Sequence, residues 1–200
     1  FGPGLEPALW VGINFAKALS AIWDIPIIPI NHMEGHIVAS LLNSKIKNQN
    51  VKFKKKEYTI INPAFPAIAL LISGGHTELV LMKDWFVYKI IGETKDDAVG
   101  EAFDKVARIL GLPYPGGPEI SRLSEKTRLE LRSKSYEVSK KTEREIKLPR
   151  PMLKSDDLNF SFSGLKTAVL YLAKNLGKLS DNNKKNIARE FEDAVTEVLT

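Results

Sequence analysis

Two apolar segments separated by a tight glycine turn lie between residues 67 and 92, and they constrain the fold more than any other feature of the sequence. The first, AIALLIS, is a continuous apolar run typical of a buried strand, and the turn GGHT follows it. The next segment, ELVLMKDWFVYKIIG, predicts one or two further strands. We therefore expect part of a β-sheet here, with a glycine turn between its first two strands.

Helical patterns lie on both sides of these strands. Residues 5–24 carry apolar side chains at helical spacing, and residues 32–44 predict a second helix that Asn31 caps. Between them, IPIIPI predicts a short strand that its prolines place at an edge or a strand end. The segment DDAVGEAFDKVARILG predicts a helix with aspartates at its start and glycine at its end, and residues 161–177 and 184–199 predict two amphipathic helices. This alternation indicates an α/β fold.

Composition limits the class of protein. With 44% hydrophobic residues in 200, the chain can bury a core, and complete disorder is excluded. The net charge of +5 and the pI near 9.2 favour an anionic partner, nucleic acid ahead of a membrane surface. Residues 45–56 and 122–154 are the candidate contacts to nucleic acid, the alternative being a solvated basic surface, and we interpret residues 45–66 as a linker. The sequence has no cysteine, no bilayer-length apolar run and no signal-peptide pattern, so we expect a cytoplasmic protein without membrane contacts.

Two of the three histidines, His32 and His36, are four residues apart. On a helix this spacing puts them on one face about a turn apart, so both imidazoles can reach one metal ion; two surface or capping histidines are the alternative. The pattern differs from the peptidase motif HExxH, because Met33 stands where that motif has glutamate. Glu34 is turned about 200° from His32 around the helix and is badly placed to act as the base of a metallopeptidase.

The glycine turn of LLISGGHTELV has two interpretations that spacing alone leaves open. It is either a simple hairpin turn or a loop whose amides surround a phosphate, as in the actin, Hsp70 and sugar-kinase fold. Similarly, Asp97, Glu101 and Asp104 share a predicted helical face that is either solvated or borders a cleft, where Asp104 could accept hydrogen bonds from ribose hydroxyls. The segment YPGGP is either a rigid turn or a point where a nucleotide approaches the backbone.

The motifs GPGLEPALWVG, NHMEGH, ALLISGGHTELV, GETKDDAVGEAFDKVARILGLPYPGGP and FSFSGLKTAV, in this order and at these intervals, closely resemble the TsaD family, the tRNA threonylcarbamoyladenosine transferases, in its bacterial form. The resemblance implies the actin-like ATPase/Hsp70/sugar-kinase fold with two lobes, here as a central fragment incomplete at both ends. Residues 1–62 would be the remainder of the first lobe with the metal-binding helix and the Lys-rich linker. Residues 63–200 would form the second lobe, with a charged helical insertion near 119–160.

The resemblance also implies an activity. The family is an acyltransferase that moves the threonylcarbamoyl group from threonylcarbamoyl adenylate to the N6 amine of the adenosine beside the anticodon, in tRNAs that read A-starting codons. Partner proteins of the TsaB and TsaE type are implied as well. Two alternatives are a carbamoyltransferase of the same fold acting on another acceptor, and a non-catalytic scaffold of the TsaB type.

Site residues follow from the resemblance position by position. His32 and His36 match metal ligands, with Fe²⁺ expected first and Zn²⁺ as the alternative. The loop residues that match the site for the phosphate and acyl part of the adenylate are Leu71, Ile72, Ser73, Gly74 and Gly75, and the nucleoside positions are Asp104 and Gly117. Ser121 replaces an acidic residue of many relatives. The family's acidic opening segment and its closing segment with a metal-binding aspartate are missing, so we expect residues 1–200 alone to bind metal weakly and to be inactive; no catalytic base can be named.

Overall fold

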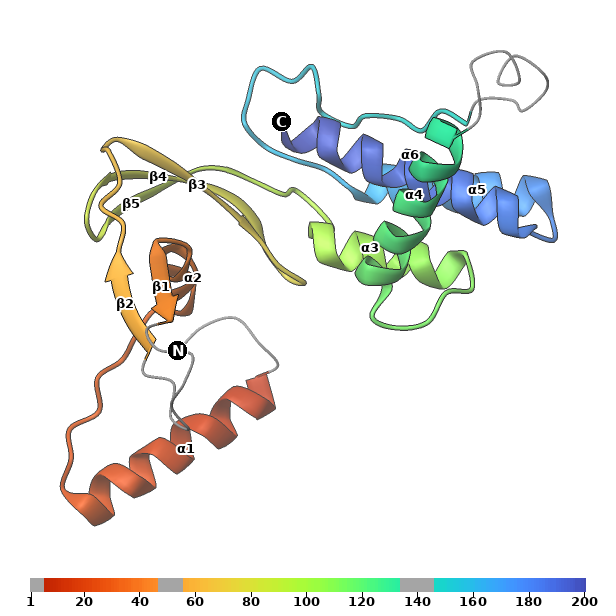
Figure 1. The fold of residues 1–200 in the computed structure, drawn as a ribbon. Coiled ribbons are helices and arrows are strands. Elements are labelled where there is room, and N and C mark those ends of the chain that lie inside the picture. Colours follow the sequence, from red (N-terminus) through yellow and green to blue (C-terminus); the bar gives the residue numbers. More distant parts are fainter. Residues whose placement is uncertain (1–5, 47–55, 134–145) are drawn as a thin grey trace. The chain divides into compact units, whose positions relative to one another are not determined.

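The computed structural model describes residues 6–46, 56–133 and 146–200, and these residues form an α/β structure (Figure 1). Its helices are α1 (Glu6–Trp23), α2 (His32–Ser40), α3 (Val99–Ile109), α4 (Gly116–Ser133), α5 (Ser163–Leu176) and α6 (Asp181–Leu199). Its strands are β1 (Leu42–Ile46), β2 (Lys56–Ile60), β3 (Ala67–Ile72), β4 (Thr77–Asp84) and β5 (Val87–Glu93). The chain divides into a first unit, residues 1–71 with 80–89, and a second unit, residues 72–79 with 90–200.

The predicted sheet is confirmed, with β3, β4 and β5 as neighbours in that order. Four residues join β3 to β4 and only two join β4 to β5, and connections this short require antiparallel neighbours. The apolar segment after the glycine turn is therefore two strands. The boundary between the two units passes through this sheet, so each unit holds part of it.

The core of the first unit forms where α2 packs on strand residues. Ile37 of α2 is buried together with Leu71, Val80 and Met82 of the sheet. Asn31 caps α2 as predicted, because its side-chain oxygen accepts hydrogen bonds from the amides of Met33 at 2.9 Å and Glu34 at 3.5 Å. Burial of Ile37 thus fixes which face of α2 is turned away from solvent.

Three predictions in the first half were wrong. The helix predicted over residues 32–44 ends at Ser40, and residues 42–44 belong to strand β1. Residues 25–30 form no strand in the described structure, because Pro26 and Pro29 lack the amide that a strand ladder needs. Residues 45–66, predicted as a linker, contain the end of β1 and the whole of β2, and these strands pair antiparallel from Leu42 opposite Ile60 to Ile46 opposite Lys56. Tyr58, Thr59 and Ile60 are residue types that favour extended structure. The many lysines nearby led to the interpretation as a linker instead. Residues 47–55 lie outside the described residues.

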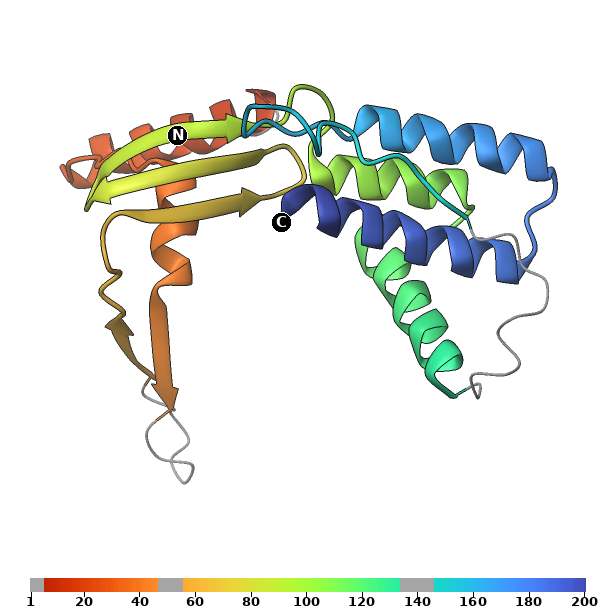
Figure 2. The same ribbon diagram turned by 90° about the horizontal axis from the view of Figure 1, so that it is seen from above.

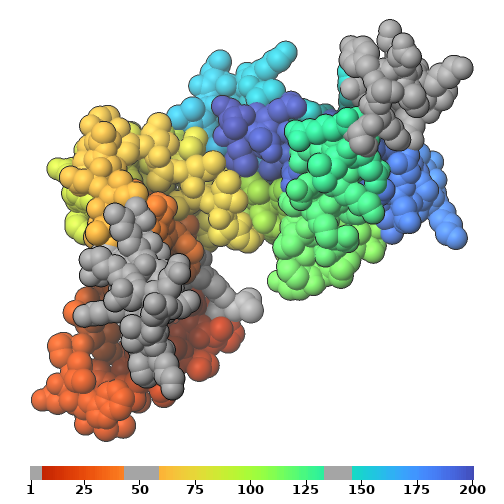
Figure 3. Space-filling view, viewed as in Figure 1, coloured from red at the N-terminus to blue at the C-terminus, as the bar shows by residue number. Residues whose placement is uncertain are grey.

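The second unit is built on a helical core from α3, α4, α5 and α6. In Figure 2, α3, α5 and α6 run alongside one another, and Figure 3 shows the atoms of α3 and α4 in continuous contact. Phe162, Leu165, Ile187 and Phe191 are completely buried, and each large apolar side chain contributes about 1.5–3 kcal/mol on burial. The ring of Phe103 packs edge-on against Phe191, with centroids 5.0 Å apart.

The helices at 161–177 and 184–199 are confirmed as α5 and α6, whereas the charged helical insertion expected near 119–160 is helical only up to Ser133 among the described residues. Residues 146–162 contain no helix, since Pro149 and Pro151 disfavour one. Within the described residues, no helix combines the length and apolar character that crossing a bilayer requires.

Candidate functional site

The two histidines of α2 converge. The Nε2 atoms of His32 and His36 are 3.0 Å apart, and their rings meet edge to face with centroids 4.5 Å apart. Both residues are exposed. The arrangement allows either a shared proton between two neutral imidazoles or, with both Nε2 atoms deprotonated, two nitrogens on one cation.

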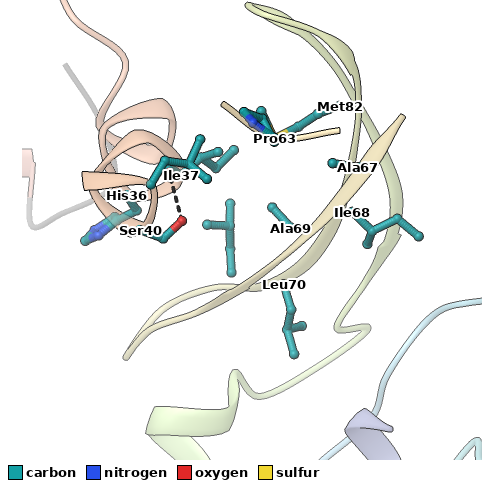
Figure 4. A pocket seen from close by; sticks show the side chains of 11 residues that line it. His36, Ile37, Ser40, Pro63, Ala67, Ile68, Ala69, Leu70 and Met82 are labelled. Atoms are coloured by element: carbon teal, nitrogen blue, oxygen red, sulfur yellow. Dashed lines mark hydrogen bonds between the residues drawn. The ribbon is translucent and has the colours of Figure 1, made fainter. Parts of the chain in front are cut away.

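The imidazole of His36 is turned away from the apolar interior of the first unit. A cavity of about 280 Å³ lies between α2 and β3; His36 is among its lining residues, but the lining is mainly apolar, with side chains such as Ile37, Leu70 and Met82. Figure 4 shows the ring nitrogens of His36 on the far side of the helix from the strand residues, while Ser40 donates its hydroxyl proton to the Ile37 carbonyl at 2.7 Å. The histidine pair is therefore open to a ligand from solvent.

Geometry supports half of a metal site. Two nitrogens bound to one ion at about 2.1 Å in tetrahedral geometry stand about 3.4 Å apart, close to the observed 3.0 Å. Among the described residues, no group of three histidine, cysteine, aspartate or glutamate side chains is placed to hold a metal ion. The pair fits two ligands of an ion whose other positions require further donors.

The glycine turn is closed by Ser73. Its hydroxyl oxygen accepts from the amides of Gly75 at 3.3 Å and His76 at 3.0 Å, and its own amide donates to the His76 carbonyl at 2.8 Å. A side chain added at Gly74 or Gly75 would meet nothing within 4 Å. The turn is thus ordered by its own serine and presents bare backbone on its open side. Of the preceding positions, Leu71 is buried and Ile72 is exposed.

The turn is packed directly against the start of α3. The Gly100 amide donates to the Ser73 carbonyl at 3.3 Å, and a Cβ at Gly100 would lie 2.8 Å from the Cα of Gly74. Glycine is therefore required at position 100 for this backbone contact. Thr77, at the end of the turn, accepts a hydrogen bond from the Val99 amide at 2.9 Å.

Asp104 and Gly117 lie next to each other in the second unit. The Oδ1 atom of Asp104 accepts from the amide of Gly116 at 2.7 Å, at the first residue of α4. A Cβ at Gly116 would lie 2.5 Å from that of Ala107, so α3 and α4 approach each other too closely for a side chain there. Gly117 has open space around it. In the described structure no protein donor bonds to Oδ2 of Asp104, which leaves this oxygen available to a ligand.

The predicted acidic face of α3 takes a different form. Asp97 lies before the helix, which begins at Val99, and it accepts from Lys105 at 2.8 Å and from Lys166 at 2.9 Å. Burial tends to raise the pKa of Asp97, but the two lysines outweigh this effect and lower it. Glu101 also pairs with Lys105. Asp97 and Glu101 thus form ion pairs within the protein.

Asp96 is a residue whose role the sequence did not reveal. Its Oδ1 accepts from the amides of Phe162 at 2.8 Å and Ser163 at 3.0 Å, and its Oδ2 accepts from the hydroxyls of Ser161 and Ser163, each at 2.6 Å. Phe162 occupies the N-cap of α5, but its side chain cannot accept a hydrogen bond from these amides, so Asp96 accepts them instead. Partial burial opposes ionisation of Asp96, yet these hydrogen bonds lower its pKa from 3.8 to about 2. The motif SFS, residues 161–163, thus supplies the hydrogen-bond partners of Asp96.

Replacing Asp96 by asparagine is expected to lower the free energy of unfolding at pH 7 by about 1 kcal/mol, less than the whole pKa shift implies because the residue is exposed. The folded pKa is the lower one, so the stabilisation is complete above pH 3.8 and declines as the pH falls towards 2. Urea unfolding of both proteins between pH 7 and pH 2.5 measures this. A difference between the two that stays constant over this range would contradict the assignment.

Two sequence expectations about charged surface change in the structure. Ser121, at the position where the resemblance led us to expect an acidic residue, donates to the carboxylate of Glu192 at 2.6 Å. In the basic region 122–154, Arg122 pairs with a glutamate of its own helix, while Arg128 and Arg150 pair with carboxylates of α6. Because these three arginines already form ion pairs within the protein, they are less suited to bind RNA phosphates. Most of residues 45–56 lie outside the described residues.

An α/β structure with a histidine pair on one helix and a glycine turn packed on another has the features that the motifs led us to expect. The sequence profile of the family described as "TsaD: tRNA N6-adenosine threonylcarbamoyltransferase" matches residues 1–200. The chain belongs to the TsaD family, whose fold is of the actin-like ATPase and sugar-kinase type.

Curated relatives carry the same description. The chain is 48% identical over 200 residues to "tRNA N6-adenosine threonylcarbamoyltransferase" of Paraburkholderia xenovorans (strain LB400), a match that covers 99% of this chain and 50% of the relative. Proteins of the same name from Methylobacillus flagellatus and Burkholderia mallei are 46% and 47% identical over 200 and 204 residues. These matches cover 100% and 99% of this chain and 50% of each relative. The chain thus spans about half the length of the curated relatives it matches.

Proposed function

We propose that the protein that contains these residues transfers the threonylcarbamoyl group of threonylcarbamoyl adenylate to the N6 amine of the adenosine beside the anticodon, in tRNAs that read A-starting codons. The observation that carries the proposal is the family match over residues 1–200 together with relatives of that name at 46–48% identity. The net charge of +5 is compatible with a tRNA substrate.

The glycine turn, Asp104 and Gly117, all in the second unit, supply most of the proposed substrate site. Gly74 and Gly75 present backbone without side chains, so the phosphate and acyl part of the adenylate can approach closely, next to Leu71 and Ile72. The Ser73 hydroxyl, whose oxygen already accepts from two amides, keeps its own proton to donate to the phosphate. Oδ2 of Asp104 is free to accept from the nucleoside, which rests against the open backbone at Gly117.

In the reaction, the amine nitrogen attacks the carbonyl carbon of a mixed anhydride, the bond between that carbon and the phosphate oxygen breaks, and AMP leaves. The carbonyl is already activated, so the protein's task is placement and stabilisation of charge. His32 and His36 would hold a divalent ion, Fe²⁺ or alternatively Zn²⁺, which supplies Lewis-acid stabilisation when bound. The amine must also lose a proton. We assign the acceptance of this proton to none of the described side chains.

We propose the two-lobed arrangement on the same grounds, with residues 1–62 in the first lobe and residues 63–200 in the second. The two compact units divide the chain differently, with residues 63–71 and 80–89 in the first unit. Partners of the TsaB and TsaE type and a cytoplasmic location belong to this proposal. So does the expectation that residues 1–200 alone are inactive, because two imidazoles leave most coordination positions of an ion to water.

Depletion of the gene in the organism that carries it tests the proposal. We expect threonylcarbamoyladenosine to disappear from the tRNA of depleted cells and to return when the gene is restored, measured by mass spectrometry of digested tRNA. Unchanged modification in depleted cells would refute the proposal. A carbamoyltransferase of the same fold that acts on another acceptor would then be the remaining enzyme hypothesis. A scaffold of the TsaB type is disfavoured, because that paralogue lacks the histidine pair.

A further inference from the structure

We propose that Thr77 is a positioning residue for the glycine turn: its buried hydroxyl fixes the first turn of α3, and α3 in turn holds the backbone that binds the adenylate. The inference rests on the proposed function, because it takes the adenylate as the ligand of the turn. It adds a residue to the site that does not contact the ligand.

The hydroxyl of Thr77 supplies a hydrogen-bond acceptor that the start of α3 itself lacks. Thr77 is completely buried, and its Oγ1 accepts from the Val99 amide at 2.9 Å. Ala98, at the N-cap of α3, has no side chain that can accept this amide. Val99 is itself buried, and an amide left without an acceptor in such surroundings is costly. Removal of the hydroxyl therefore forces the start of α3 to shift or to open to water.

A shift at the start of α3 is transmitted to the glycine turn. The Gly100 amide is bonded to the Ser73 carbonyl at 3.3 Å, and the backbones of Gly100 and Gly74 lie so close that a Cβ on Gly100 would be 2.8 Å from the Cα of Gly74. No side chain lies between the two backbones to absorb a displacement. The turn must follow the helix, because close-packed backbones transmit strain.

The same helix carries Asp104, whose Oδ1 binds the amide of Gly116 at 2.7 Å. One rigid helix thus sets the spacing between the turn proposed for the phosphate and the residues proposed for the nucleoside. Both ends of the adenylate must fit this spacing at once. Loss of the Thr77 hydroxyl is therefore expected to weaken substrate binding rather than to remove a chemical group from the reaction.

The test compares Thr77→Val with Thr77→Ser in the full-length protein with its partners, supplied with threonylcarbamoyl adenylate and unmodified tRNA. We expect Thr77→Val to raise the KM for the adenylate about tenfold, the factor that one lost hydrogen bond represents, and Thr77→Ser to restore it. Thr127→Val is the matched control, since Thr127 is also buried and its hydroxyl bonds within α4 and to α6. It should lower stability while the KM stays unchanged.

Hydrogen exchange gives a readout that is independent of activity. In Thr77→Val, amides 73–76 and 99–101 should exchange faster than in the unaltered protein, while Thr127→Val should leave them protected. If Thr77→Val does not fold, Gly100→Ala displaces the turn without removing a hydroxyl and should raise the KM in the same way. A folded Thr77→Val protein with unaltered KM and unaltered exchange at these amides would overturn the inference. If the unaltered protein forms no modified tRNA, the proposed function fails, and exchange still decides the role of Thr77.

Discussion

Replacement of both His32 and His36 by alanine is expected to reduce threonylcarbamoyladenosine formation by more than about 100-fold, since removal of residues that only support metal ligands already costs 10–100-fold. Bound iron or zinc, measured by elemental analysis after dialysis, should fall in parallel. Both side chains are exposed, and alanine is the better helix former, so α2 should persist in the variant. The loss would then reflect ligand chemistry rather than unfolding.

Glu34→Gln is the matched control for the histidine pair. Glu34 lies on the same helix, but its charge acts on Tyr88, whose pKa is raised by burial and by this neighbouring carboxylate. The Glu34→Gln protein should keep its bound metal and its activity. A double histidine variant that retains both stoichiometric metal and product formation would contradict the assignment of the pair as ligands.

Replacement of Glu190 by alanine is expected to lower the free energy of unfolding by about 3 kcal/mol. Glu190 is 9% exposed, and its Oε1 accepts from the buried Leu148 amide at 2.9 Å and from the guanidinium of Arg150. Removal of the carboxylate leaves that amide without its acceptor and a largely buried cation with one partner fewer. Hydrogen bonds from Arg150 to Glu197 and Glu190 outweigh burial, so the pKa of Arg150 is raised and it stays charged.

Glu197→Ala is the comparison for Glu190, because Glu197 pairs with the same arginine through a carboxylate that is 55% exposed. It should cost no more than about 1 kcal/mol, as exposed ion pairs do. For Glu190→Gln, which keeps an acceptor for the Leu148 amide, the loss of unfolding free energy should lie between those of Glu190→Ala and Glu197→Ala. Urea unfolding at neutral pH measures all three, and equal losses for Glu190→Ala and Glu197→Ala would show that burial of the pair is not what matters.

Local patterns predicted the elements whose stability depends on local residues. The strands β3 to β5, the helices α5 and α6 and the Asn31 cap of α2 follow from apolar periodicity and a cap adjacent in sequence. The spacing of His32 and His36 likewise placed them on one helical face, and their Nε2 atoms do meet. These features involve residues within a few positions of one another.

Helix starts that depend on distant residues could not be predicted. The aspartates before α3 looked like its first turn, yet Thr77 caps that helix from 22 residues away. Asp96 caps α5 across 66 residues of sequence. The N-cap residues of these two helices, Ala98 and Phe162, have no side-chain acceptor of their own. The interpretation of residues 45–66 as a linker failed for a related reason, since β1 and β2 stabilise each other only by pairing.

The measurement that tests the central claim most directly is reconstitution with the complete natural gene product, its partner proteins, threonylcarbamoyl adenylate and unmodified tRNA. Digestion to nucleosides and mass spectrometry then report the product. We predict threonylcarbamoyladenosine only when adenylate and a tRNA reading an A-starting codon are both present. Folded, metal-loaded protein that leaves this tRNA unmodified would contradict the account.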